Sequence, residues 1–150
     1  MSGVVSYELF NTRFPSSNGF TSDGGLYETF INDTGAPSIL GTIVVASSTV
    51  ADAVSTAPIS SMMPIGVIAE DGIANGSPVK VITYGKAYVL LKDGESATLG
   101  YWCGVSDVAG RMYQLSAVPV TPEYNQEIGH SLNTTASGTD VLSLIQVHFN

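Results

Sequence analysis

The chain has 150 residues, of which 44% are hydrophobic and only 12% charged. A chain of this length buries roughly 68–70% of the surface that its unfolded form exposes, so one core can fold without a metal or disulfide. Thirteen acidic and five basic side chains give a formal net charge of -8. Because this charge repels phosphate backbones and anionic headgroups, we expect neither nucleic-acid binding nor membrane binding.

The N-terminal sequence bears on where the protein is synthesised, and the single cysteine bears on which covalent cross-links it can form. No basic segment followed by about 7–15 apolar residues opens the chain, so no secretory signal is predicted and synthesis in a cytoplasm is expected. Cys103 is the only cysteine, which excludes an intrachain disulfide and a cysteine-based metal cluster.

Residues 1–37 form a first region, rich in Gly, Ser, Thr and Asn, in which aromatic residues are isolated from one another. Because the aromatic positions show no sustained periodicity, two interpretations stay open. The region is either an extended N-terminal arm that packs onto something else through its aromatics, or a meandering first pair of strands. The aromatics that would anchor such an arm are Phe10, Phe14, Phe20, Tyr27 and Phe30.

Residues 38–150 consist of short β-branched runs separated by turn residues, a pattern typical of a β-sandwich or β-barrel. A loop at 47–61 has room for one helical turn around Asp52. The segment 79–92 predicts a hairpin with a tight turn at Gly85. Further strands are predicted at 39–46, 63–69, 102–106, 112–115, 127–132 and 141–149.

No window carries the apolar spacing of a long helix, so we predict an all-β fold: a small β-barrel or β-sandwich with an extended N-terminal arm and little helix. In the last strand, Val141 and every second residue after it share one face. The strand around Val89 is apolar on both faces, which indicates either a central position or a face covered by another subunit.

The chain offers few of the groups that catalysis needs. His130 and His148 lie in no metal-ligand spacing, so a zinc site would have to recruit distant carboxylates. A thiol triad of Cys103, His130 and Asp107 is conceivable, but a thiol within a predicted strand is usually a small buried hydrophobe. We therefore predict no catalytic residue, no metal ligand and no cofactor.

Trp102 and three tyrosines support an alternative function. Together with Tyr88, Tyr101 and Tyr113, it could form the aromatic platform of a carbohydrate-binding or host-adsorption module. Aromatics in strands more often fill a core or an interface.

The order of several short β-rich segments over about residues 32–150 resembles that of tailed-bacteriophage capsid decoration (cement) proteins. The matching segments are Asn32-Asp33-Thr34-Gly35-Ala36-Pro37-Ser38 and its following strand, Pro64-Ile65-Gly66-Val67-Ile68-Ala69-Glu70-Asp71-Gly72, the run 79–91, Gly100-Tyr101-Trp102, Ser106-Asp107-Val108-Ala109-Gly110-Arg111, Glu127-Ile128-Gly129-His130-Ser131-Leu132 and the terminal Ile145-Gln146-Val147-His148-Phe149-Asn150.

This resemblance implies a non-enzymatic structural protein on the outer surface of a virion. Such a protein forms a homotrimer and clamps neighbouring major capsid subunits after the head expands. Under this interpretation residues 1–37 are the arm and 38–150 the decoration domain. Candidate contacts with the capsid or with other subunits are Phe10, Phe14, Phe20, Tyr27, Phe30, His148 and Phe149.

Overall fold

The computed structural model of the protein describes residues 18–116, 120–121 and 123–149, and strands dominate them. This confirms the all-β class with little helix. The elements are β1 (Asn18–Phe20), β2 (Gly25–Asn32), β3 (Ile43–Ala46), β4 (Ala53–Thr56), β5 (Gly66–Ile68), β6 (Pro78–Leu90), β7 (Trp102–Val105), β8 (Met112–Gln114), α2 (Glu123–Gln126), β9 (Glu127–Ser131) and β10 (Leu142–Val147). Among the residues that the structure describes, no helix is long and apolar enough to cross a bilayer.

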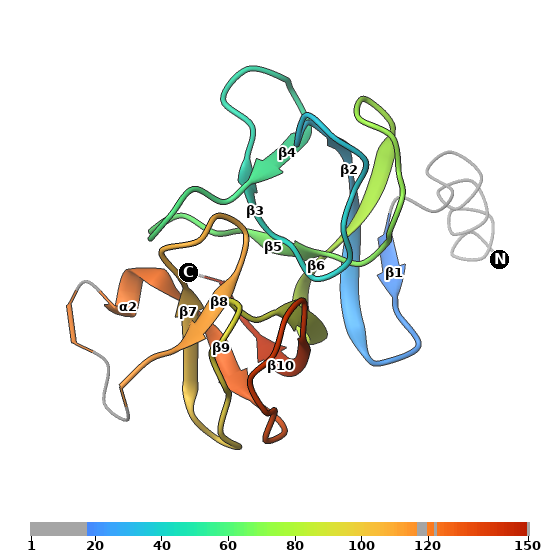
Figure 1. The fold of residues 1–150 in the computed structure, drawn as a ribbon. Coiled ribbons are helices and arrows are strands. Elements are labelled where there is room, and N and C mark those ends of the chain that lie inside the picture. The colour runs from blue at the N-terminus through green and yellow to red at the C-terminus, as the bar shows by residue number, and fades with distance from the viewer. Residues whose placement is uncertain (1–17, 117–119, 122, 150) are drawn as a thin grey trace, which may run out of the picture.

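The strands form one sheet that closes on itself in part. β2 pairs with both β4 and β6, and the pairings β4–β3, β3–β5 and β5–β6 complete a ring of five strands. From β6 the sheet continues through β10, β9 and β7 to β8, while β1 is added beside β2. Figure 1 shows the ring above and strands β7–β10 below it. The predicted barrel-like or sandwich-like domain is therefore a small ring extended by a second layer.

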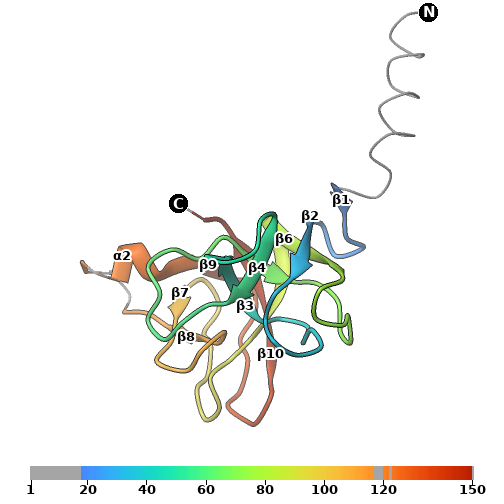
Figure 2. The same ribbon diagram turned by 90° about the horizontal axis from the view of Figure 1, so that it is seen from above.

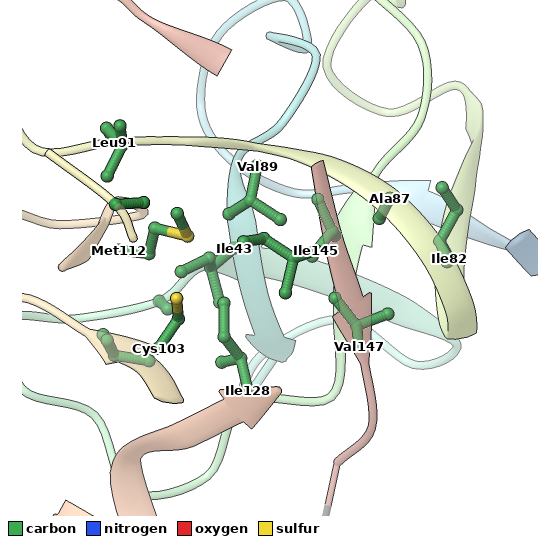
Figure 3. Packing of buried hydrophobic residues seen from close by; sticks show 14 residues of the cluster. Ile43, Ile82, Ala87, Val89, Leu91, Cys103, Met112, Ile128, Ile145 and Val147 are labelled. Carbon is green, nitrogen blue, oxygen red and sulfur yellow. The ribbon is translucent and has the colours of Figure 1, made fainter. Parts of the chain in front are cut away.

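Two hydrophobic cores hold these parts together. The smaller one contains Val44, Val54, Ile68, Val79 and Val81. The larger one unites the ring residues Ile43, Val67, Ile82 and Val89 with side chains of β7–β10. Figure 3 shows Val89 together with Cys103, Met112, Ile128, Ile145 and Val147. Each fully buried aliphatic side chain stabilises the fold by about 1.5–3 kcal/mol.

β6 contributes to both cores and corrects the predicted hairpin at Gly85. It is one continuous strand of 13 residues, because Gly85 adopts a φ of 95° without reversing the chain. The register with β2 leaves Thr83 as an extra residue, a β-bulge. Such a bulge switches the face to which the following side chains point. Val81 therefore faces the smaller core and Val89 the larger one.

The loop predicted at 47–61 contains a strand in place of a helical turn. Asp52 has a φ of 55° and precedes β4, whose first two residues, Ala53 and Val54, are buried. These two residues pair with β2, and the strand also pairs with β3, so tertiary pairing outweighs the small-residue loop composition. The strands predicted at 39–46 and 63–69 are shorter, running over Ile43–Ala46 and Gly66–Ile68.

From residue 18 onward, the N-terminal region is a pair of strands. β1 pairs with β2, and β2 pairs with β6 from Gly25 to Ile31, so this part belongs to the sheet instead of an arm. Phe10 and Phe14 lie outside the described residues. In the last strand, Ser143, Ile145 and Val147 are buried and alternate with less buried residues, which confirms the predicted alternation.

Candidate functional site

The outer side of the sheet exposes large apolar side chains. Phe20 pairs with Leu26, and Leu26 pairs with Tyr84, so the three side chains lie on one face across β1, β2 and β6. Tyr88 lies on the same face of β6, with Lys86 between it and Tyr84, and pairs with Leu144 of β10. Phe20 is 77% exposed and Tyr84 59% exposed. We call Phe20, Leu26, Tyr84, Tyr88 and Leu144 the apolar face.

A polar row continues this side of the sheet toward β7. Lys86 pairs with Gln146, Gln146 with His130, and His130 with Trp102. Directly opposed residues on neighbouring strands point to the same side. The row therefore brings His130 and Trp102 together at the end of the sheet where α2 lies. Figures 1 and 2 both place α2 and β1 at opposite ends of the molecule.

A β-bulge in β9 brings Glu127 onto the same side as His130. Residues three positions apart in a regular strand point to opposite faces. Here Cys103 pairs with Gly129 while Gly104 pairs with Glu127, so Ile128 is the extra residue of the bulge. The bulge turns the Glu127 carboxylate toward the outer side, while Ile128 remains in the larger core.

Aromatic contacts fix the rings around this point. The centroids of Trp102 and His130 lie 4.1 Å apart, and those of Trp102 and Tyr124 lie 6.3 Å apart with nearly perpendicular planes. His148, just after β10, lies with its ring centroid 5.6 Å from that of His130 and 6.4 Å from that of Trp102. Residues of α2, β7, β9 and the segment after β10 therefore meet in one cluster.

Glu127 is the buried member of this cluster, with a side chain only 4% exposed. Its Oε1 atom lies 2.9 Å from His148 Nε2, yet no donor among the described residues is aligned to make a hydrogen bond to Oε1. Burial raises the pKa of the Glu127 carboxyl, and the charge of the nearby His130 opposes this rise. One ligand atom from each of Glu127, His130 and His148 lies within 4.8 Å of the others. We call these three residues the His-Glu cluster.

Sequence spacing did not reveal the His-Glu cluster. Glu127 and His130 are three positions apart, a spacing that places two side chains on one face of a helix but on opposite faces of a regular strand. Only the bulge at Ile128 joins them, and only the pairing of β10 with β9 brings His148 near. The signal that could have found the pair is Gly129, which interrupts an otherwise regular strand pattern.

The conceivable thiol triad is not assembled. Cys103 is fully buried, its thiol lies 3.8 Å from the carbonyl oxygen of Tyr101, and desolvation raises its pKa to about 12. Asp107 is exposed and pairs with Lys92, with 2.8 Å between Oδ1 and Nζ. The expectation of a buried structural thiol is confirmed.

The residues predicted to contact the capsid or other subunits occupy different surroundings. Phe20 lies on the apolar face. Tyr27 and Phe149 pack against the larger core, and Phe30 packs against the smaller one, so these three rings contribute to the domain itself. His148 belongs to the His-Glu cluster.

The predicted aromatic platform is only partly assembled. Trp102 contacts the rings of Tyr124, His130 and His148. Tyr88 lies on the apolar face, and the hydroxyl of Tyr113 is 3.4 Å from Gln126 Oε1.

No family model and no curated protein matches this chain.

Proposed function

We propose that the protein is a structural virion component that binds the outside of a bacteriophage head and stabilises the expanded capsid by clamping neighbouring major capsid subunits. The apolar face is the observation that carries this proposal. The resemblance of residues 32–150 to capsid decoration proteins also supports the proposal. The proposed activity is binding alone, without a catalytic step.

The apolar face has the chemistry of a protein-binding surface. Exposed apolar side chains grouped on one face of a domain mark an interaction site, and aromatic residues are enriched at the centres of interfaces. Phe20 and Tyr84 are more than half exposed, and the face crosses four strands that are held by main-chain pairing. A rigid surface of this kind loses little conformational entropy when it binds a partner.

β1 offers a second mode of attachment. It is one of the two terminal strands of the sheet among the described residues, the other being β8, and a tight turn joins its three residues to β2. A terminal strand can pair with an extended segment of another chain, where main-chain hydrogen bonds supply affinity and side chains such as Phe20 supply specificity.

A homotrimer would bind more tightly than its single contacts suggest. When one subunit is attached, the other contacts of the trimer become intramolecular, so modest interfaces sum to stable attachment. A protein that binds only the expanded shell also stabilises that state by mass action. The net charge of -8 suits a surface that faces solvent and keeps virions apart.

Light scattering and co-sedimentation test the proposal. The purified full chain is sized by light scattering, then mixed with expanded heads stripped of it and pelleted. We expect a trimer that co-sediments in a saturable amount. A chain that stays in the supernatant at all concentrations would contradict the proposal and favour the carbohydrate-binding alternative, which a glycan screen examines directly.

Surface variants connect the result to the apolar face. Phe20→Ser combined with Tyr84→Ser is expected to weaken head binding at least tenfold while the trimer persists. Leu99→Ser is the matched control, because Leu99 is also an exposed apolar residue, 61% accessible, but lies in the loop before β7. Equal binding by the double variant and the control would remove the apolar face from the interface.

A further inference from the structure

The His-Glu cluster contains a buried carboxylate oxygen whose hydrogen-bonding capacity is unused. Glu127 is 96% buried, and its Oε1 faces His148 Nε2 at 2.9 Å, with no donor aligned to it in the part of the chain that the structure describes. A buried carboxylate without a partner is costly, so such groups normally pair with a donor or coordinate a metal. We propose that Glu127, His130 and His148 bind one divalent transition-metal ion of the zinc class.

The donor set matches this ion. Two imidazole nitrogens and one carboxylate oxygen are a common three-residue set for zinc, and they leave a fourth position for water. Donors about 2.0–2.2 Å from a tetrahedral ion lie about 3.4 Å from one another. The three ligand atoms here lie within 4.8 Å of one another. The site therefore closes when the longest of these separations shortens by up to about 1.4 Å, a shift that side-chain rotation can supply.

The surroundings hold the ligands in place. The Trp102 ring packs on His130 at 4.1 Å, and the bulge at Ile128 fixes the direction of Glu127. Residues that orient a metal ligand contribute strongly to affinity. The single thiol, Cys103, does not compete for the ion, because it is buried and protonated at neutral pH.

The ligand types also define the selectivity. Imidazole nitrogens favour Zn²⁺, Co²⁺, Ni²⁺ and Cu²⁺, whereas Mg²⁺ and Ca²⁺ prefer sets made of oxygen atoms. We expect Zn²⁺ to bind in the presence of a large excess of Mg²⁺.

Binding would connect two parts of the sheet that meet at the C-terminal segment. Glu127 and His130 belong to β9, and His148 follows β10, where its backbone N–H donates to the carbonyl oxygen of Ile128. An ion held by all three residues ties this segment to β9. Because the ligand set is assembled only in the folded chain, zinc should raise the unfolding temperature in a concentration-dependent manner.

The test uses the full chain without an affinity tag, after treatment with a chelator. Zn²⁺ is titrated by calorimetry, and Co²⁺ is titrated while visible absorption and tryptophan fluorescence are followed. The chain contains a single tryptophan, Trp102, so quenching by Co²⁺ reports binding beside that ring. We expect one ion per chain, a cobalt absorption band of low-coordinate type and quenched fluorescence.

Substitutions identify the ligands. His148→Ala removes a partly exposed side chain, so we expect the fold to be kept. Zinc binding should weaken by about 10–100-fold or more, because changing a residue that only orients a metal ligand already costs this much affinity. Glu127→Gln should do the same, whereas Glu28→Gln, an exposed glutamate on β2, serves as the control. Absence of zinc binding by the wild-type chain, or affinity unchanged in His148→Ala and Glu127→Gln, would overturn the proposal. Equal competition by Mg²⁺ would overturn it as well.

Discussion

Gly129 lies directly against the main-chain carbonyl of Gln146, so that a Cβ atom on Gly129 would come within 1.9 Å of the Gln146 oxygen. Gly129 also has a φ of 147°, in a region that L-residues with side chains rarely adopt. These two constraints occur in the bulge that directs Glu127 toward His130. The close approach of β9 to β10 therefore requires glycine at this position.

We expect Gly129→Ala to lower the free energy of unfolding by at least about 3 kcal/mol, because overpacking and backbone strain each cost about 1–3 kcal/mol. Urea unfolding followed by circular dichroism measures the change. Gly94→Ala is the control, since Gly94 has a φ of 82° but no atom of the described residues lies within 4 Å of the position of an added Cβ. Its cost should stay near the roughly 1–2 kcal/mol of a left-handed conformation alone. Equal losses in the two variants would show that the contact with Gln146 relaxes.

Arg111 joins three segments of the chain. Its Nη1 donates to the carbonyl oxygen of Leu91 at 3.0 Å and to Asp93 Oδ1 at 2.9 Å, and its Nη2 donates to Asp140. The side chain is only 21% exposed. No local pattern predicts this role of Arg111, because its three partners lie between 18 and 29 positions away along the chain.

We expect Arg111→Ala to destabilise the fold by about 1.5–3 kcal/mol, the range for hydrogen bonds to a charged group. Arg111→Lys should recover only part of this, because an ammonium group cannot reach three acceptors as the planar guanidinium does. Thermal unfolding of the wild-type chain and both variants shows whether their stabilities follow this order. Full recovery by lysine would mean that the positive charge alone matters.

The sequence predicted the parts of the fold that depend on local alternation. The alternation of the last strand was predicted correctly, because buried residues alternate with less buried ones along β10, although the strand is shorter than the predicted 141–149. The Gly85 hairpin was wrong because a glycine with positive φ can serve a turn or a bulge equally well. The choice is decided by β2 and β10, which pair with opposite halves of β6 and keep it continuous through Gly85.

The candidate site could be predicted less well than the fold. His130 and His148 were recognised as the two histidines of the chain, but their approach to Glu127 depends on a bulge and on a long-range pairing. Neither leaves a fixed spacing in the sequence. The apolar face likewise arises from cross-strand rows, because Phe20, Leu26 and Tyr84 become neighbours only through the register of β1, β2 and β6.

The exposed pair of Lys92 and Asp107 predicts a shifted titration. A hydrogen bond from the Lys92 ammonium lowers the pKa of the Asp107 carboxyl, and the same contact raises the pKa of Lys92. The stabilisation from Asp107 is therefore present at neutral pH and is lost as the pH falls through its lowered pKa. That from Lys92 is lost only as the pH rises through its raised pKa.

Carboxyl ¹³C shifts measured against pH should give an Asp107 midpoint below its ordinary value. In Lys92→Met, which keeps an apolar stem of similar length, the midpoint should return toward 3.8. High salt should produce part of the same return in the wild-type chain, because exposed charges are screened. A wild-type midpoint that matches that of Lys92→Met would contradict the pairing.

Cys103 is expected to resist alkylation in the folded protein. Its thiol is fully buried and desolvation raises its pKa to about 12, so at pH 8 only roughly one thiol in 10⁴ is in the reactive thiolate form. Iodoacetamide labelling followed by mass spectrometry should be slow in buffer and complete within minutes in concentrated guanidinium chloride, where the same thiol regains ordinary reactivity. Because access to the buried thiol requires opening of the sheet, Gly129→Ala should accelerate native labelling more than Gly94→Ala does. Rapid labelling of the wild-type chain in buffer would mean that β7 opens far more readily than its place in the larger core implies.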